Sequence, residues 1–337
     1  MSGLQILWFI LIGLLFAIFF FLEGFDFGVG MSLATLAKSE DEVDQAIATI
    51  GPVWDGNEVW LLTAGGAMFA AIPFWYSSLF SGYYLLMLLI LVGLIIRGVS
   101  FEFRATHPEE KHKILWGKLC SVGSFLAPFM LGMVFTSLIQ GMPIDENGNL
   151  SAGFFDYVNF LSIVGGVAVA LLCYLHGLNY LALRTEGDIR KRAKDFAKVL
   201  YPVLYAGEVV FAILLFIFTD FVTNRPVVTI ALLAAIVLAT VIAHLSVLKE
   251  KELAAFIASG LTFFLLVALL FQGLFPRVMI AKDARFDILL KDATSSPLTL
   301  KTMTIVTLII LPFVLAYTIW TYYVFRKRVS GERIESY

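Results

Sequence analysis

Carboxylates inside otherwise apolar stretches are the residues of this sequence most able to do chemistry. Glu23 and Asp26 lie three positions apart in FLEGFDFGVG, so they share one face of a helix. Asp55 and Glu58 lie in GPVWDGNEVW, with Asn57 between them. An ionisable side chain costs at least about 2.5–3.5 kcal/mol in the lipid core, so these groups must face protein or water. Carboxylates held together near water could pass protons into a membrane protein.

A third charged group follows another apolar stretch, in RGVSFEFR, where Arg97 is followed by Glu102 and Arg104. The loop charges described below place all three groups at one membrane surface. Two simpler explanations remain open at the level of sequence. Acidic residues in a first helical turn interact favourably with the helix dipole, and charged side chains at a helix end extend toward water.

Small and aromatic residues accompany the charges. Gly24 and Gly28 are four positions apart, a spacing that lets a second helix backbone approach closely. Gly65 and Gly66 predict similar close packing deeper in the membrane, and Trp54 is typical of an interfacial aromatic belt. The structural and interface candidates are therefore Trp54, Asn57, Arg97, Gly24, Gly28, Gly65 and Gly66.

Glu208, in YAGEVVF, is an acid near the middle of an apolar stretch. Such a residue is protonated and hydrogen-bonded, or paired, or part of a pathway, and the sequence does not choose among these. Cys120 and Cys173 form no metal or haem attachment motif and are expected to be small buried apolar residues. The four histidines show no metal-ligand spacing, so we expect no metal site and no haem in this chain.

The composition and the apolar runs predict an all-α polytopic membrane protein. The 337 residues are 60% hydrophobic and 15% charged, against about 45–50% and about 25% in soluble domains, and the mean hydropathy is +0.88. A net charge of −2 gives no indication of a nucleic-acid partner. We expect one integral membrane domain over 1–337, with two four-helix groups plus one extra helix. The nine predicted spans are 5–33, 54–72, 78–99, 117–139, 157–182, 199–219, 226–247, 253–275 and 303–325.

The positions of the basic residues predict the orientation. With the N-terminus outside, the segments on the inner side hold 18 of the 24 Lys and Arg residues. This bias indicates an outside N-terminus and a cytoplasmic C-terminus.

Seven stretches together resemble subunit II of the cytochrome bd quinol oxidases. They follow one another from the N-terminus to the C-terminus and so cover nearly the whole chain. They are FLEGFDFGVGM, GPVWDGNEVWLLTAGGAMFAA, FSGYYL, RGVSFEFR, LIQGMPID, DATSSPLTLKTMT and YVFRKRV.

The resemblance implies a subunit of the bacterial cytoplasmic membrane that pairs with a related subunit I. Subunit I would carry two b-type haems, one d-type haem and the quinol site. The complex would oxidise menaquinol or ubiquinol, reduce oxygen to water and take its protons from the cytoplasm, electrogenically but without pumping. Some family members hold a structural quinone, and a small accessory subunit is compatible with the family.

The resemblance also assigns residues, one position at a time. The proton-path carboxylate of the W-D-G-N motif falls on Asp55, and a second acidic position falls on Glu102. The acids of the first motif fall on Glu23 and Asp26, and Glu58 is a further candidate for the proton path.

Two alternatives compete with this interpretation. A proton-coupled secondary transporter would also carry acids in its spans, but its site should lie at the midplane between two repeats. A purely structural subunit would use Asp55 and Glu102 only to stabilise helix ends or an interface.

Overall fold

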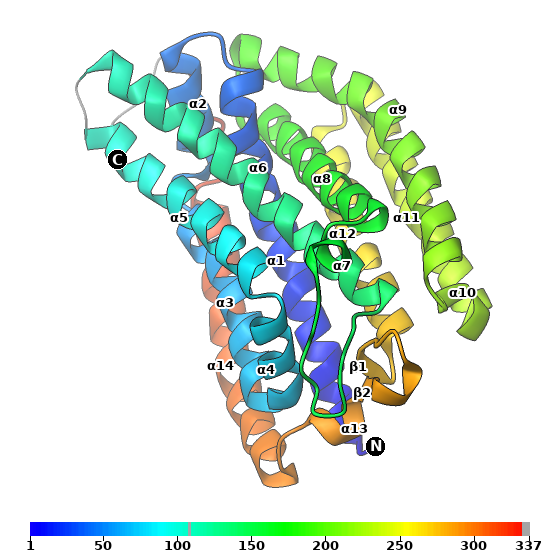
Figure 1. Ribbon diagram of the computed structural model, residues 1–337. Helices are drawn as coiled ribbons and strands as arrows, with labels where there is room; N and C mark the ends of the chain where they lie inside the picture. The colour runs from blue at the N-terminus through cyan, green and yellow to red at the C-terminus, as the bar shows by residue number, and fades with distance from the viewer. Residues whose placement is uncertain (107–108, 332–337) are drawn as a thin grey trace.

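The computed structural model describes residues 1–106 and 109–331 as a bundle of long helices (Figure 1). The long helices are α1 (Gly3–Thr35), α3 (Trp54–Ala71), α5 (Tyr84–Thr106), α6 (Glu110–Gln140), α8 (Phe160–Arg184), α9 (Gly187–Phe218), α11 (Pro226–Leu248), α12 (Glu252–Leu274) and α14 (Pro297–Val324). Shorter helices are α2 (Glu40–Ile50), α4 (Pro73–Gly82), α7 (Phe154–Tyr157), α10 (Phe221–Asn224), α13 (Leu290–Ala293) and the 3-10 turn Ala284–Phe286.

Eight helices of the described chain are long and apolar enough to cross a membrane: α1, α5, α6, α8, α9, α11, α12 and α14. The prediction of an all-α polytopic membrane protein is therefore confirmed. The predicted second span, 54–72, forms α3, which has 18 residues but a polar first turn and is not among the eight.

One predicted boundary is wrong. The span expected at 78–99 is interrupted at Tyr83, where α4 ends and α5 begins. α3 itself stops before Pro73, because proline has no N–H for the helical ladder and disfavours a helical conformation at the preceding residue. Ile72 accordingly has φ −133° and ψ 63°, and α4 starts with Pro73 in its first turn.

α1 is the central helix of the bundle, and it packs against α3, α6, α8 and α12 (Figure 1). α5 packs along α6, α9 lies against α8, and α11 lies against α12 and α9. α14 contacts α1 and α3 but has no buried residue in its most apolar stretch. The apolar surface of α14 is therefore mostly exposed on its side of the molecule.

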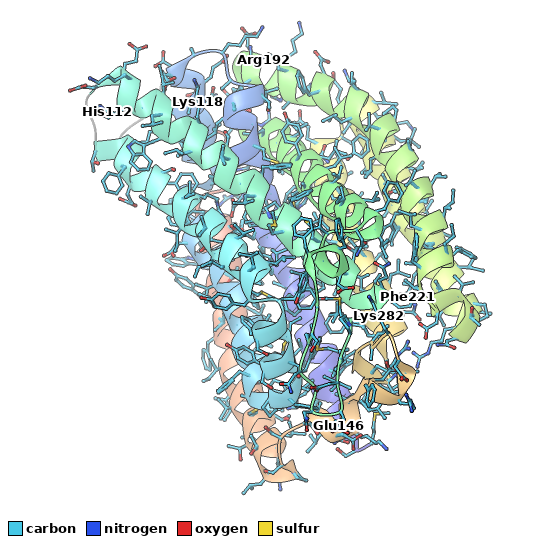
Figure 2. The ribbon with its side chains drawn as sticks, viewed as in Figure 1. His112, Lys118, Glu146, Arg192, Phe221 and Lys282 are labelled. Carbon is cyan, nitrogen blue, oxygen red and sulfur yellow. The ribbon has the colours of Figure 1, made fainter. Side chains whose placement is uncertain are left out.

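The connections gather at the two ends of the bundle. At the end where α1 begins, the strands β1 (Arg277–Met279) and β2 (Ile288–Leu289) pair antiparallel, with Arg277 opposite Leu289 (Figure 1). Figure 2 shows Lys118 and Arg192 at the opposite end, and Glu146 and Lys282 toward the end of the strands. Charged side chains thus cap both ends of an apolar body.

Candidate functional site

A fully buried ion pair joins α1 to α5. The Arg97 guanidinium donates through Nη1 to Glu23 Oε1, and both side chains have zero exposure. Glu58 of α3 reaches the same guanidinium, with 3.8 Å between Arg97 Nη1 and Glu58 Oε2. One cation thus lies between carboxylates from two other helices, as a buried charge needs, while its Nε and Nη2 have no hydrogen-bond partner among the described residues.

Aromatic rings enclose the Arg97 guanidinium on its remaining sides. Its centre lies 5.0 Å from the Phe27 ring, 5.8 Å from the Trp54 ring and 5.6 Å from the Phe101 ring. The rings of Trp54 and Phe101 also contact each other, with centroids 5.0 Å apart. These ring faces attract the cation and keep lipid and water away from it.

A second polar group lies one turn further along α1. Asn57 Nδ2 donates to Asp26 Oδ2 at 2.7 Å and to the Leu22 carbonyl at 3.4 Å. Tyr322 of α14 donates its hydroxyl to Asn57 Oδ1 at 2.8 Å. Asp26 is fully buried, and its Oδ1 has no hydrogen-bond partner among the described residues. A carboxyl group with a free buried oxygen can accept or release a proton when water or a partner group reaches it.

Close helix crossings support this cluster. A Cβ added to Gly28 would lie 2.1 Å from the Cys173 carbonyl and 2.7 Å from the Gly177 Cα, so glycine allows α1 and α8 to touch through their backbones. Gly24 faces the Phe263 ring of α12, 3.2 Å from the position of an added Cβ.

Gly65 and Gly66 correct the sequence-based expectation of close packing inside this chain. A Cβ on either residue would meet nothing within 4 Å, and Gly66 is exposed. Both line a cavity of about 630 Å³ on the outer side of α3 and α5. No described neighbour in this chain requires glycine at these two positions. Gly65 and Gly66 therefore remain candidates only for an interface with another chain.

Asp55 and Glu102 occupy a different environment from the buried acids. Both side chains are exposed on α3 and α5, at the end of the bundle where α1 finishes (Figure 1). Neither is hydrogen-bonded into the buried cluster. Glu58, three positions after Asp55, is the half-buried acid between the exposed residue and Arg97.

Arg104 anchors the end of α5 beside this exposed pair. Its guanidinium pairs with Glu40 at 2.7 Å and with Asp44 at 2.8 Å, both on α2. It also donates to the Lys113 carbonyl at 2.6 Å. Arg104 therefore ties the end of α5 to α2.

Glu208 lies apart from these groups, on α9. Its Oε1 accepts from the Thr240 hydroxyl of α11 at 2.6 Å, and its Oε2 is buried without a partner among the described residues. The structure therefore does not bring Glu208 together with the acids of α1 and α3.

The described residues contain no group of three or more His, Cys, Asp and Glu placed to hold a metal ion. His176 is fully buried, but Ser259 engages its Nδ1 at 2.8 Å and its Nε2 donates to the Phe21 carbonyl at 3.0 Å. Both ring nitrogens are thus occupied, and His176 does not fit the role of a haem ligand.

Tyr322 is the site residue that sequence reasoning missed. It lies 265 positions from Asn57, and no local spacing links α14 to α3. Tyr322 lies near the end of the last apolar run, where tyrosine is common at the membrane interface, so its position did not mark it as a site residue.

The fold and the cluster define a multi-pass helical membrane protein whose interior holds paired charges. The model of the cytochrome bd terminal oxidase subunit II family matches residues 4–325. Cytochrome bd ubiquinol oxidase subunit 2 of Bacillus subtilis (strain 168) is 45% identical over 100% of both chains. Cytochrome bd-I ubiquinol oxidase subunit 2 of Escherichia coli (strain K12) is 33% identical, over 98% of this chain and 97% of the relative.

A solved structure shares the architecture. A chain from the structure of bd oxidase from Geobacillus thermodenitrificans matches with a TM-score of 0.74 and 16% identity, covering 96% of this chain and 97% of that chain. This likeness shows the fold alone.

The chain belongs to the cytochrome bd terminal oxidase subunit II family. It is a component of a terminal quinol oxidase complex and a multi-pass protein of the bacterial cytoplasmic membrane. The comparisons support the oxidase interpretation and not the transporter alternative.

Proposed function

We propose that this chain forms part of the route by which cytoplasmic protons reach the oxygen-reducing centre of the complex. The observation that carries the proposal is the order of the acids. Asp55 is exposed, Glu58 is half-buried beside Arg97, and Glu23 and Asp26 are fully buried. Proton uptake requires a series of acids that begins at the water-exposed surface and continues into the protein interior.

The two buried acids have different roles in this proposal. Glu23 is held by Arg97, so it fixes the charge balance of the cluster. Both acids have one buried oxygen without a partner, but the other oxygen of Asp26 is bound by the neutral Asn57 amide and not by a cation, so Asp26 is the better group to exchange a proton. Tyr322 holds the Asn57 side chain in the orientation that points its amide toward Asp26.

The partner and the redox groups follow from the family. We propose that the chain pairs with subunit I through the exposed side of α3, α5 and α14, and that Asp55 and Glu102 stay open to cytoplasmic water at the edge of this contact. Two haems b and one haem d would lie in subunit I, where menaquinol or ubiquinol is oxidised and O₂ is reduced. A structural quinone, if the complex holds one, fits the aromatic-lined cavity of about 630 Å³ beside Trp75 and Tyr76.

We propose nine spans in one integral membrane domain over 1–337, with α3 as the ninth. An α-helix of 18 residues is about 27 Å long, close to the hydrocarbon thickness of about 30 Å. In chain order, the two proposed four-helix groups are α1, α3, α5 and α6 and then α8, α9, α11 and α12, with α14 as the extra helix. The groups are in close contact, since α8 packs against both α1 and α6. The N-terminus would lie on the outer side of the membrane. The C-terminal residues 332–337 are not among the residues that the structure describes.

The test is Asp55→Asn in the complete oxidase. Asparagine keeps the size and hydrogen bonding of the side chain but cannot exchange a proton. We expect oxygen reduction to fall at least about tenfold, as for loss of a group that transfers protons, while the reduced-minus-oxidised haem spectrum is unchanged. Asp41→Asn, on the exposed face of α2, is the matched control and should leave the rate unchanged. Loss of haem together with activity would instead identify Asp55 as an assembly residue.

A further inference from the structure

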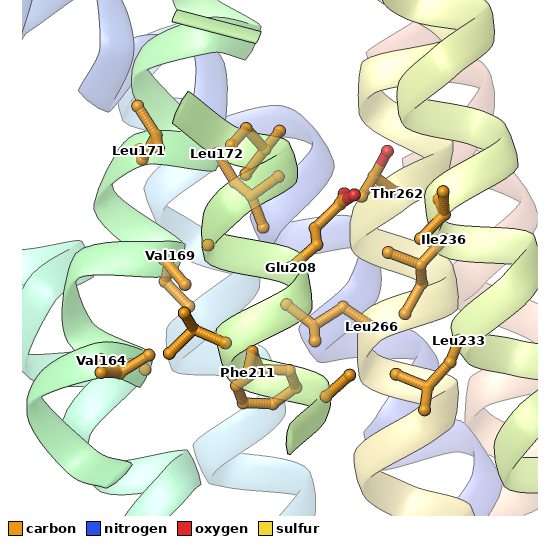
Figure 3. A pocket seen from close by; sticks show the side chains of 18 of the residues that line it. Val164, Val169, Leu171, Leu172, Glu208, Phe211, Leu233, Ile236, Thr262 and Leu266 are labelled. Atoms are coloured by element: carbon orange, nitrogen blue, oxygen red, sulfur yellow. The ribbon is translucent and has the colours of Figure 1, made fainter. Parts of the chain in front are cut away.

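A cavity with none of the acids of the charged cluster in its lining lies between α8, α9, α11 and α12. It has a volume of about 870 Å³, within the range of about 300–1,000 Å³ that is typical of small-molecule sites. Figure 3 shows Glu208 extending from α9 toward Thr262 and Ile236, across the cavity from Val164 and Val169. The proposed proton path does not use this region.

The cavity opens toward the hydrocarbon of the bilayer. Its outer lining includes Val203 and Val210 of α9 and Val237 and Leu238 of α11, whose exposed fractions lie between 39% and 59%. Gly207 keeps the space open, because a Cβ added there would meet nothing within 4 Å. A molecule that enters the cavity must therefore come from the membrane and be lipophilic.

Among the described lining side chains, only that of Glu208 has a buried polar atom without any hydrogen-bond partner. The other polar lining side chains, Thr136 and Thr262, donate to the carbonyls of their own helices, Gly132 at 2.6 Å and Ala258 at 3.2 Å. Glu208 Oε1 is bound by Thr240, whereas Oε2 is buried without a partner. An unpaired buried carboxyl oxygen is costly in a medium without water.

This oxygen gives the cavity its selectivity. Lipid tails are as apolar as the cavity walls, so burying hydrocarbon there yields little preference for one lipid chain over another. A head group that bonds Glu208 Oε2 does give a preference. An ionised carboxylate needs a donor and a protonated one needs an acceptor, and a hydroxyl group can be either. A quinone carbonyl only accepts, and an ammonium only donates.

We propose that this cavity binds a membrane-dissolved lipophile with a hydroxyl head, hydrogen-bonded to Glu208 and with its hydrocarbon body along α9 and α11. The site is independent of the proposed proton path. Where the hydroxyl donates to the ionised carboxylate, an alcohol should be favoured over its methyl ether, which cannot donate, by about tenfold, the ratio that corresponds to about 1.4 kcal/mol.

The test uses the complete oxidase in its native membrane and two photoreactive probes, a long-chain alcohol with a diazirine in its chain and the methyl ether of the same molecule. We expect the alcohol to label the lining of α9, α11 and α12, and hexadecanol to compete about tenfold better than hexadecyl methyl ether. Mass spectrometry of the labelled peptides gives the positions.

Three variants give the structural controls. Gly207→Leu fills the cavity and should abolish labelling by both probes, and Val209→Leu, on the exposed face of the same helix and outside the lining, should not change it. Glu208→Leu should remove the preference for the alcohol, and Glu208→Gln, which still offers a donor and an acceptor, should keep most of it.

Each contrary result would overturn the proposal. Equal labelling by alcohol and ether would mean that the cavity does not require a hydroxyl head, and a preference that survives Glu208→Leu would mean that Glu208 selects nothing. Labelling that survives Gly207→Leu would place the probe on the lipid-facing surface. Competition by a quinone as strong as that by the alcohol would make a quinone the occupant. None of these readouts depends on whether Asp55 conducts protons.

Discussion

The molecule contains acids in two intramembrane regions that differ in almost every respect. On α1, Glu23 and Asp26 are fully buried and have partners from α5 and α3. On α9, Glu208 is half-buried at the edge of an open apolar cavity and has one threonine partner. The difference teaches that the surroundings of an intramembrane acid, and not its presence alone, decide what it can do.

Packing follows the same division. Around the charged cluster, α1 and α8 touch through glycine backbones, and aromatic rings surround the cation. Around Glu208, the helices α9 and α11 leave a cavity of about 870 Å³. A dense site keeps charged groups in fixed positions for proton exchange, whereas an open site can admit a molecule from the membrane.

The largest effect should come from breaking the buried ion pair. Arg97→Met leaves Glu23 buried without its cation, a change that costs about 3–5 kcal/mol. We expect little assembled complex, measured as haem-containing oxidase per unit of membrane protein. The double variant Arg97→Met/Glu23→Gln should recover part of the yield, because the fully buried unpaired charge is gone and only the half-buried Glu58 has lost its cation. A double variant as poor as the single one would show that the pairing is not the reason for the loss.

The second largest effect should be a difference in thermal stability between variants at Gly28 and at Gly207. Gly28→Ala places a methyl group against the α8 backbone and should cost at least about 1–3 kcal/mol, seen as a lower midpoint of thermal unfolding of the purified complex. Gly207→Ala meets open space and should leave the midpoint unchanged or raise it, since alanine is the better helix former. Similar midpoints for the two variants would contradict the difference in packing.

A smaller effect should come from Tyr322→Phe. It leaves Asn57 Oδ1 without its donor, so Asn57 can turn away from Asp26. A net hydrogen bond of about 0.5–1.5 kcal/mol corresponds to a two- to tenfold fall in oxygen reduction, with a changed pH profile and an unchanged haem spectrum. Tyr323→Phe, on an exposed neighbour, is the control, and an equal effect of both variants would remove Tyr322 from the site.

The smallest effect should come from a surface ion pair, Asp156 with Lys282, which sets the scale for the buried pairs. The hydrogen bond from the Lys282 ammonium lowers the pKa of Asp156. The unfolded chain therefore binds more protons, and the pair stabilises the fold above the ordinary pKa of about 3.9 and loses this effect as the pH falls through the lowered pKa. Asp156→Asn should cost less than about 1 kcal/mol at neutral pH and nothing in acid, measured as unfolding midpoints. A larger loss in acid than at neutral pH would contradict this sign.

The sequence predicted those parts of the structure that depend on local pattern. Apolar runs of sufficient length identified the long helices, and a spacing of three placed Glu23 and Asp26 on one face of α1. The interruption at Tyr83 was not predicted, because no proline marks it. Pro73 explains where α4 begins, whereas the break itself lies at Tyr83, whose φ of −96° and ψ of 23° depart from helical values.

The remaining site features depend on contacts between distant segments. The bond from Tyr322 to Asn57 joins helices at opposite ends of the sequence. The open surroundings of Gly65 and Gly66 differ from the crowded surroundings of Gly28, although the residues are chemically identical. Sequence spacing gives the face of a helix on which a residue lies, but it does not give what that face meets.

The most direct measurement of the central claim is the rate of oxygen reduction by Asp26→Asn and by Glu208→Gln, each normalised to haem content from the reduced-minus-oxidised spectrum. Both changes replace an intramembrane carboxyl with an amide of the same shape. The proposed path predicts a fall of at least about tenfold for Asp26→Asn and no change for Glu208→Gln. Equal rates in the two variants, or a fall only for Glu208→Gln, would contradict the assignment of proton uptake to the cluster of α1, α3 and α5.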